Sequence, residues 1–240
     1  MSVLYLVRHG QAGTRENYDS LSDLGARQAR LLGEHFAQQG IEFQAAYAGS
    51  LSRQRATGAD VLRAASSDTQ IAVDSGWDEF DLAHVYRDMA PHLVQADSDF
   101  AREYAEMQRA LVESRGAHDA PVHRRWNDCD RKAVRAWVEA RYPFTGEPWA
   151  AFVERVQAAL SRAAAKCLES GGNVIVFTSA TPIGVSAART LEIGDGRAMW
   201  MAAVLFNASF STLRVRENEV RLFSFNASPH LASAELRTFR

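Results

Sequence analysis

The chain has 240 residues, a formal net charge of −2, 47% hydrophobic residues and 23% charged residues. This composition is typical of a soluble globular protein with a full-sized core, and it excludes disordered and fibrous classes. The near-neutral charge gives no general attraction to nucleic acid or to acidic membranes, so neither is expected as a partner. Cys129 and Cys167 are isolated, which argues against a metal site or a disulfide framework. No apolar run resembles a signal peptide or a membrane span, so a cytoplasmic location is expected.

The first quarter of the chain alternates short apolar runs with amphipathic segments. Residues 3–7 form a continuous apolar run, which is typical of a strand buried on both faces. A helix is predicted after an N-cap at Ser22, with Gln28 among the residues that face water. A second strand at residues 45–48 precedes a helix that Ser50 is predicted to cap. This order favours a parallel sheet with covering helices.

The segment from about residue 83 to residue 146 differs in character. Apolar residues at helical spacing are separated by a polar, turn-rich stretch, which predicts helices. The segment has too few apolar residues for a core of its own, so we interpret it as a helical cap insertion. The whole chain, residues 1–240, is therefore expected to form a single domain.

Regular α/β order returns after this insertion. An amphipathic helix that begins at Trp149 precedes an apolar strand at residues 174–177, and a helix capped by Thr181 follows. Three late strands are then predicted, near residues 201–206, 210–215 and 220–225. The complete pattern predicts an α/β fold: a three-layer sandwich with a mainly parallel sheet, helices on both faces and a helical insertion.

Polar residues follow the predicted strands at their carboxyl ends, where open α/β sheets bind ligands. Arg8 and His9 follow the first strand, and Ser179 follows a later buried strand. Arginine offers a planar set of donors to phosphate, and helix N-termini near Ser50 and Thr181 would add N–H groups and a favourable dipole. The pattern predicts a site for a small anion, in which the neutral imidazole of His9 can attack phosphorus.

The tripeptide Arg-His-Gly is weakly informative alone, because a surface ion pair and a hydrogen-bonded structural histidine explain it equally well. The surrounding series is more specific: "LYLVRHGQ", "LSDLGARQARLLGEHF", "YAGSLSRQRATGADVL", "WDEFD", "FVERVQAAL", "NVIVFTSATPIG" and "NAS". In this order the motifs resemble the histidine phosphatase superfamily, the phosphoglycerate-mutase-like fold. The resemblance covers about residues 1–80 and 147–231 and leaves the middle insertion unmatched.

The resemblance implies a role for each matching residue. His9 matches the nucleophile that carries the phosphoryl group, and Arg8 and Arg53 match the two phosphate-binding arginines. Arg55 lies two residues further along a predicted helix and is interpreted as a solvated charge. No metal ion or other cofactor is expected, because the arginines supply the positive charge and no carboxylate cluster has metal-ligand spacing.

The proton donor and the second histidine of the family are less simply matched. The segment "WDEFD" resembles the one that bears the proton donor, which falls on Glu79, with Asp78 and Asp81 as rivals. Ser179 stands where the family has a second histidine, so a hydrogen-bond donor is kept and a potential positive charge is lost. His84 is the best candidate among the remaining histidines to replace it.

The resemblance implies a metal-independent phosphomonoesterase that acts through a phosphohistidine intermediate on a small phosphorylated substrate. Two alternatives stay open. One is a catalytically weakened member that binds a phosphorylated ligand, which the serine at position 179 favours and the retained nucleophile and proton donor oppose. The other, a phosphoglycerate-type mutase, ranks lower because the Trp-Asn and Gly-Trp pattern of true mutases is absent after "RHGQ".

Overall fold

The computed structural model describes residues 2–15, 17–114, 122, 127–217 and 219–239. Contacts divide the chain into two compact units: Met1–Glu79 with Val153–Phe239, and Phe80–Phe152. Within the described ranges, no helix has the length and apolar character needed to span a membrane.

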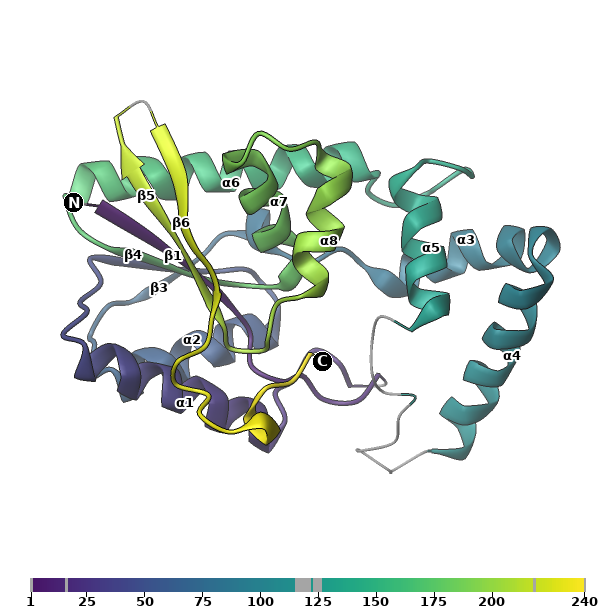
Figure 1. Ribbon diagram of the computed structural model, residues 1–240, viewed down its shortest axis with the longest axis horizontal. Coiled ribbons are helices and arrows are strands. Elements are labelled where there is room, and N and C mark those ends of the chain that lie inside the picture. The colour runs from purple at the N-terminus through teal and green to yellow at the C-terminus, as the bar shows by residue number, and fades with distance from the viewer. Residues whose placement is uncertain (1, 16, 115–121, 123–126, 218, 240) are drawn as a thin grey trace. The chain divides into compact units, whose positions relative to one another are not determined.

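The first unit is built around a six-stranded sheet with the strand order β3-β2-β4-β1-β5-β6 (Figure 1). The strands are β1 (Ser2–Arg8), β2 (Ala45–Ala48), β3 (Ile71–Val73), β4 (Val174–Thr178), β5 (Phe210–Arg216) and β6 (Glu219–Ala227). The neighbours β3, β2, β4 and β1 run parallel, whereas β5 pairs antiparallel with β1 and with β6. The mainly parallel sheet predicted from the sequence is confirmed, and the late hairpin forms its antiparallel edge.

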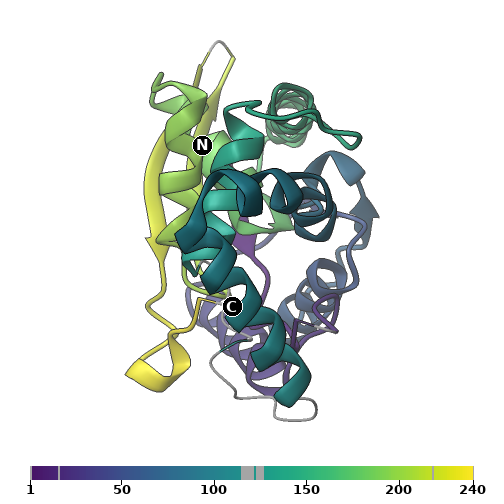
Figure 2. The same ribbon diagram turned by 90° about the vertical axis from the view of Figure 1, so that its right-hand side faces the viewer.

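Helices cover both faces of this sheet, as the sequence predicts. On one face lie α1 (Asp23–Gln38) and α2 (Ser52–Ala64); on the other lie α7 (Ala180–Thr190) and α6 (Trp149–Ser170), which enters this unit at Val153 (Figures 1 and 2). The hydroxyl of Ser22 accepts a hydrogen bond from the N–H of Gly25, which confirms the predicted N-cap of α1.

Alternate residues of the central strands pack against the helical layers. On the side of α1 and α2, Tyr5, Val7, Ile175 and Phe177 join one buried cluster with side chains such as Phe36. The ring of Phe36 meets that of Tyr5 edge to face, with 5.6 Å between the centroids. Such a pair adds about 0.5–1.5 kcal/mol beyond the burial of its area. This packing fixes the carboxyl ends of β1 and β4, and with them the residues that follow.

The strand predicted near residues 201–206 is wrong. Its first residues end helix α8 (Ala198–Ala203), which packs against α7. Helix α8 contains three alanines, the residue with the highest intrinsic helix propensity, and this preference outweighs the strand-like apolar run that follows it.

Two predicted helix caps also lie elsewhere. Helix α2 begins after Leu51 rather than after Ser50, and Thr181 lies inside α7, whose N-cap is Ser179. Pro182 therefore occupies the third position of α7. A proline is tolerated there because the first-turn N–H groups have no partner within the helix.

The second unit is helical, as predicted for the segment at residues 83–146. It contains α3 (Leu82–Ala96), α4 (Ser98–Glu113) and α5 (Asp128–Val138), while residues 115–121 and 123–126 lie outside the described ranges. The ring of Trp137 meets a group of aromatic side chains: Phe80, Phe144, Trp149 and Phe152. The unit thus buries an aromatic cluster of its own, which the composition of the segment did not suggest.

Candidate active site

The register of the sheet brings His9 and Ser179 to neighbouring strand ends. Arg8 of β1 pairs with Thr178 of β4, and the N–H of His9 donates to the carbonyl of Thr178 at 2.9 Å. The two residues that leave these parallel strands are therefore His9 and Ser179. The first turn of α2, which follows the neighbouring strand β2, supplies Arg53.

The glycine of the Arg-His-Gly motif lets the chain pass directly beside α1. A Cβ atom on Gly10 would collide with the backbone carbonyl of Gly25, so no larger residue fits. The N–H of Gly10 donates to the hydroxyl of Thr57 at 3.0 Å, and the side chain of Asn207 donates to the carbonyl of His9 at 3.3 Å. These contacts hold the backbone on both sides of the imidazole.

The imidazole of His9 is buried, with 1% of the residue exposed. Its Nδ1 lies 2.7 Å from the carbonyl oxygen of Gly10, which can only accept a hydrogen bond. On the other side of the ring, Nε2 lies 3.3 Å from Nε of Arg53, which can only donate one. Together these two contacts assign the proton to Nδ1 and the lone pair to Nε2. In this tautomer the imidazole is neutral, and the lone pair on Nε2 faces the guanidinium of Arg53.

The side chain of Asp19 contacts both Arg53 and the first residue of α2. The carboxylate of Asp19 lies 3.0 Å from Nη1 of Arg53 and accepts the N–H of Ser52 at 3.0 Å. Partial burial opposes ionisation of Asp19, but these N–H groups and the charge of Arg53 lower its pKa overall. The guanidinium also lies over the ring of Tyr18, 4.8 Å from its centroid, and that ring meets His9 edge to face.

Arg8 is buried, with 3% of the residue exposed. Its guanidinium donates to the carbonyl of Leu205 and, at 3.2 Å, to that of Phe239. Its Nε–H has no hydrogen-bond partner among the described residues. Burial lowers the pKa of Arg8, whereas Tyr18 and Glu79 act in the opposite direction. Arg8 is thus a poorly solvated positive charge that the carboxylate of Glu79 helps to stabilise.

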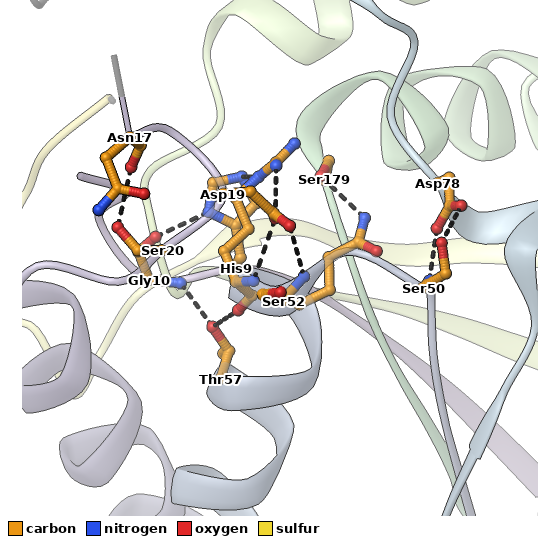
Figure 3. A network of polar contacts seen from close by, with 12 residues as sticks. His9, Gly10, Asn17, Asp19, Ser20, Ser50, Ser52, Thr57, Asp78 and Ser179 are labelled. Atoms are coloured by element: carbon orange, nitrogen blue, oxygen red, sulfur yellow. Dashed lines mark hydrogen bonds and ion pairs between the residues drawn. The ribbon is translucent and has the colours of Figure 1, made fainter. Parts of the chain in front are cut away.

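Ser179 caps α7 with its backbone but not with its hydroxyl. Within the described part of the chain the hydroxyl accepts no hydrogen bond from the α7 backbone; it accepts one from Nε2 of Gln54 at 2.9 Å (Figure 3). The same nitrogen donates to the carbonyl of Trp77 at 3.1 Å, and Gln54 is completely buried. Ser179 is therefore joined to the residue that directly follows Arg53.

The three candidate proton donors are separated by their contacts. The carboxylate of Glu79 accepts the N–H of Thr181 at 3.1 Å. Glu79 therefore contacts the first turn of α7, at the residue two positions after Ser179. Asp78 instead binds the N–H and the hydroxyl of Ser50 (Figure 3). Asp81 is the N-cap of α3. Of the three, these contacts favour Glu79 as the carboxyl group of the site.

Other candidates from the sequence have different surroundings. His84 belongs to the second unit, where Nε2 lies 2.8 Å from the hydroxyl of Thr145 and 3.4 Å from the carboxylate of Asp88. Arg55 is exposed, as a solvated charge should be. Among the described residues, no group of three or more His, Cys, Asp or Glu side chains is arranged to hold a metal ion.

Sequence reasoning missed three polar contributors to the site: Asp19, Gln54 and Thr57. Thr57 lies four residues after Arg53 and therefore on the same helix face, a spacing that the sequence already contains. Asp19 carries no such signal, because it lies in an irregular turn. Gln54 carries none either, because its partner Ser179 is distant in the sequence. The prediction that Gln28 faces water is wrong. Its buried amide accepts the N–H of Gln11 at 2.8 Å and donates to the carbonyl of Leu236 at 2.8 Å.

Solved structures with the same fold include several phosphatases and a phosphoglycerate mutase. YhfR of Bacillus stearothermophilus has a TM-score of 0.65 at 16% identity, over 96% of this chain and 99% of that one. A phosphoserine phosphatase mutant of Entamoeba histolytica, solved in complex with phosphoserine, has a TM-score of 0.58 at 18% identity, over 96% of this chain and 100% of that one. Phosphoglycerate mutase of Bacillus anthracis str. Sterne has a TM-score of 0.60 at 18% identity, over 95% and 94% of the two chains.

Comparison with curated protein sequences gives no match. The family model of the histidine phosphatase superfamily (branch 1) matches residues 4–129 and 105–228. These two ranges together cover nearly the whole chain, including every strand of the sheet except the first residues of β1. The chain therefore belongs to the histidine phosphatase superfamily.

Proposed function

We propose that this protein is a metal-independent phosphomonoesterase that acts on a small phosphorylated substrate through a phosphohistidine at His9. The observation that carries the proposal is the pair of contacts made by the imidazole. With Nδ1 bonded to the carbonyl of Gly10 and Nε2 facing Nε of Arg53, the ring is neutral and its lone pair faces a cation that would bind a phosphoryl group.

In the first step, Nε2 of His9 attacks phosphorus and a nitrogen–phosphorus bond forms. The bond from phosphorus to the ester oxygen breaks, and its electron pair leaves with the alcohol. Glu79 gives that oxygen a proton as it departs. In the second step water attacks the phosphoryl group, Glu79 takes a proton from the water, and the electron pair of the broken nitrogen–phosphorus bond returns to Nε2.

Arg8 and Arg53 are assigned to the phosphoryl oxygens. Both guanidinium groups are buried, so they would act with little screening by water. Ser179 is assigned to the same group as a neutral donor. The first turn of α2 adds backbone N–H groups and the positive end of its dipole.

A second function, the binding of a phosphorylated ligand without efficient turnover, is favoured by one feature. The hydroxyl of Ser179 cannot carry the positive charge that an imidazolium would bring to the transition state. Such a protein would still use Arg8 and Arg53 to hold the ligand.

Turnover of an aryl phosphate and of a panel of phosphorylated metabolites tests the proposal. His9→Ala is expected to abolish turnover, whereas His92→Ala, which removes an exposed histidine of the second unit, leaves it unchanged. Rapid quenching should trap a phosphoenzyme that is labile to acid and stable to alkali. Phosphate binding without turnover, weakened by Arg53→Ala and not by Arg55→Ala, would support the binding function instead.

A further inference from the structure

We propose that Gln54 is a positioning residue for Ser179: its buried amide holds the serine hydroxyl so that the hydroxyl hydrogen is directed at the bound phosphoryl group. This inference rests on the phosphatase function proposed for the site. It assigns a role to a residue that touches neither His9 nor the two arginine side chains in any contact described above.

The orientation of the Gln54 amide is fixed by its neighbours. One hydrogen of Nε2 is donated to the carbonyl of Trp77 at 3.1 Å and the other to the hydroxyl oxygen of Ser179 at 2.9 Å. A carbonyl oxygen can only accept, so the nitrogen of the amide, and not its oxygen, must face Trp77. The amide therefore meets Ser179 as a donor.

This orientation determines what the serine hydroxyl can do. A hydroxyl has one hydrogen to donate, and Gln54 already occupies one of its lone pairs. The hydrogen consequently points away from Gln54. The strand register places Ser179 beside His9, which makes an acceptor held by His9 the natural partner for that hydrogen.

Ser179 is also released from the usual task of an N-cap serine. Its hydroxyl accepts no N–H from α7 in the described part of the chain, whereas Glu79 accepts the N–H of Thr181. The helix start is thus served by a carboxylate, and the serine side chain remains available to a ligand.

The surroundings of Gln54 keep its amide in this place. The residue is completely buried, and a Cβ atom on Gly49 would collide with its Oε1. Oε1 has no hydrogen-bond partner among the described residues, which costs free energy in a buried position. The two hydrogen bonds donated by Nε2, to Trp77 and to Ser179, offset this cost.

A clean test is available because the carbonyl of Trp77 has a second donor. The hydroxyl of Thr178 donates to it at 2.6 Å, so Gln54→Met leaves that carbonyl paired and deprives only Ser179 of its partner. Methionine has nearly the length of glutamine, and its flexible side chain fills the same buried space. Gln70→Met, which changes an exposed glutamine, is the matched control.

The experiment is a double-mutant cycle of Gln54→Met and Ser179→Ala, read as kcat and KM on an aryl phosphate and as the Kd for inorganic phosphate. Gln54→Met is expected to lower kcat roughly five- to tenfold, the scale of one hydrogen bond, with a smaller change in KM. In the Ser179→Ala background the same substitution should change kcat by less than about twofold, because the residue acts through a hydroxyl that is no longer present.

Equal losses in both backgrounds, or no loss in either, would overturn the proposal. Thermal melting checks that the variants fold, and Gln54→Leu replaces the methionine variant if that one does not. If the unmodified protein binds phosphate without hydrolysing the ester, the cycle is read from the Kd alone. A protein that neither binds phosphate nor turns over any ester would overturn the proposed function itself, and this inference with it.

Discussion

The carboxylate of Asp19 lies 3.0 Å from Nη1 of Arg53 and accepts the first backbone N–H of helix α2. A guanidinium group and a helix N-terminus are the two kinds of donor that bind phosphate most readily. The carboxylate of Asp19 therefore contacts donors that the proposed reaction would offer to the substrate.

Asp19→Asn is expected to strengthen binding of inorganic phosphate roughly three- to tenfold, because a negative charge next to the incoming anion is removed. The amide oxygen can still accept the N–H of Ser52, so the helix start is preserved. Isothermal titration calorimetry gives the Kd, and Asp60→Asn, which changes a half-buried carboxylate of α2 that pairs with Arg63, is the control. Weaker binding by Asp19→Asn would mean that the carboxylate is needed to orient Arg53.

Glu79→Gln is expected to slow hydrolysis of alkyl phosphates far more than that of aryl phosphates. An alkoxide needs a proton when it leaves, whereas a nitrophenolate is stable without one. The measurement is the ratio of kcat/KM for the two esters, which we expect to change by roughly a hundredfold or more. Asp78→Asn, which weakens the contact with Ser50, should leave this ratio unchanged. An equal loss on both esters would assign the proton transfer to another group.

Turnover is expected to survive extensive treatment with a chelator. In the proposed mechanism, Arg8 and Arg53 provide the positive charge that a divalent cation provides in other phosphoryl-transfer sites. The assay compares kcat before and after dialysis against the chelator, and again after magnesium or manganese is restored. Strict dependence on the added metal contradicts the mechanism.

Stability is expected to fall as the pH drops from about 6.5 to about 4, because of His230. Burial, together with the nearby His35, lowers the pKa of His230 to about 4. The unfolded chain then binds more protons than the folded chain between that value and the ordinary value of 6.5. The loss amounts to at most about 3 kcal/mol. His230→Phe should flatten the free energy of unfolding across this range in urea titrations; an unchanged slope would exclude His230 as its source.

The sequence predicted the parts of this fold that depend on local pattern. The continuous apolar runs of β1 and β4 and the capped start of α1 at Ser22 are confirmed, because burial on both faces and an N-cap leave clear signals. The short edge strand β3 (Ile71–Val73) was not predicted. Three residues that are mostly exposed give too little periodicity to identify a strand.

The site was predictable only where a motif defines it. The residues after β1 and β4 could be placed beside each other, because parallel strands end at the same edge of a sheet. The role proposed for Gln54 could not be predicted, because its amide contacts Trp77 and Ser179, which lie 23 and 125 residues away along the chain. The burial of Gln28 could not be predicted either, because its amide donates to the backbone carbonyl of Leu236, which is 208 residues away along the chain.

The contact between Ser179 and Gln54 determines which substitutions can test a histidine at position 179. Ser179→His alone would bring an imidazole against the buried amide of Gln54, which lies 2.9 Å from the serine hydroxyl. Overpacking of this kind typically costs about 1–3 kcal/mol. We therefore expect the single substitution to lower both the melting temperature and turnover.

Ser179→His combined with Gln54→Ala removes that collision. We expect the double variant to turn over an aryl phosphate at least roughly tenfold faster than the unmodified protein, because the imidazole supplies a donor and a cation where negative charge develops. Turnover and thermal melting are measured for the unmodified protein, both single variants and the double variant. Gln54→Ala alone should be slower than the unmodified protein, since Ser179 loses its partner. If the double variant folds and turns over no faster, then the lack of a histidine at position 179 does not limit turnover, and the site is adapted to Ser179 and Gln54.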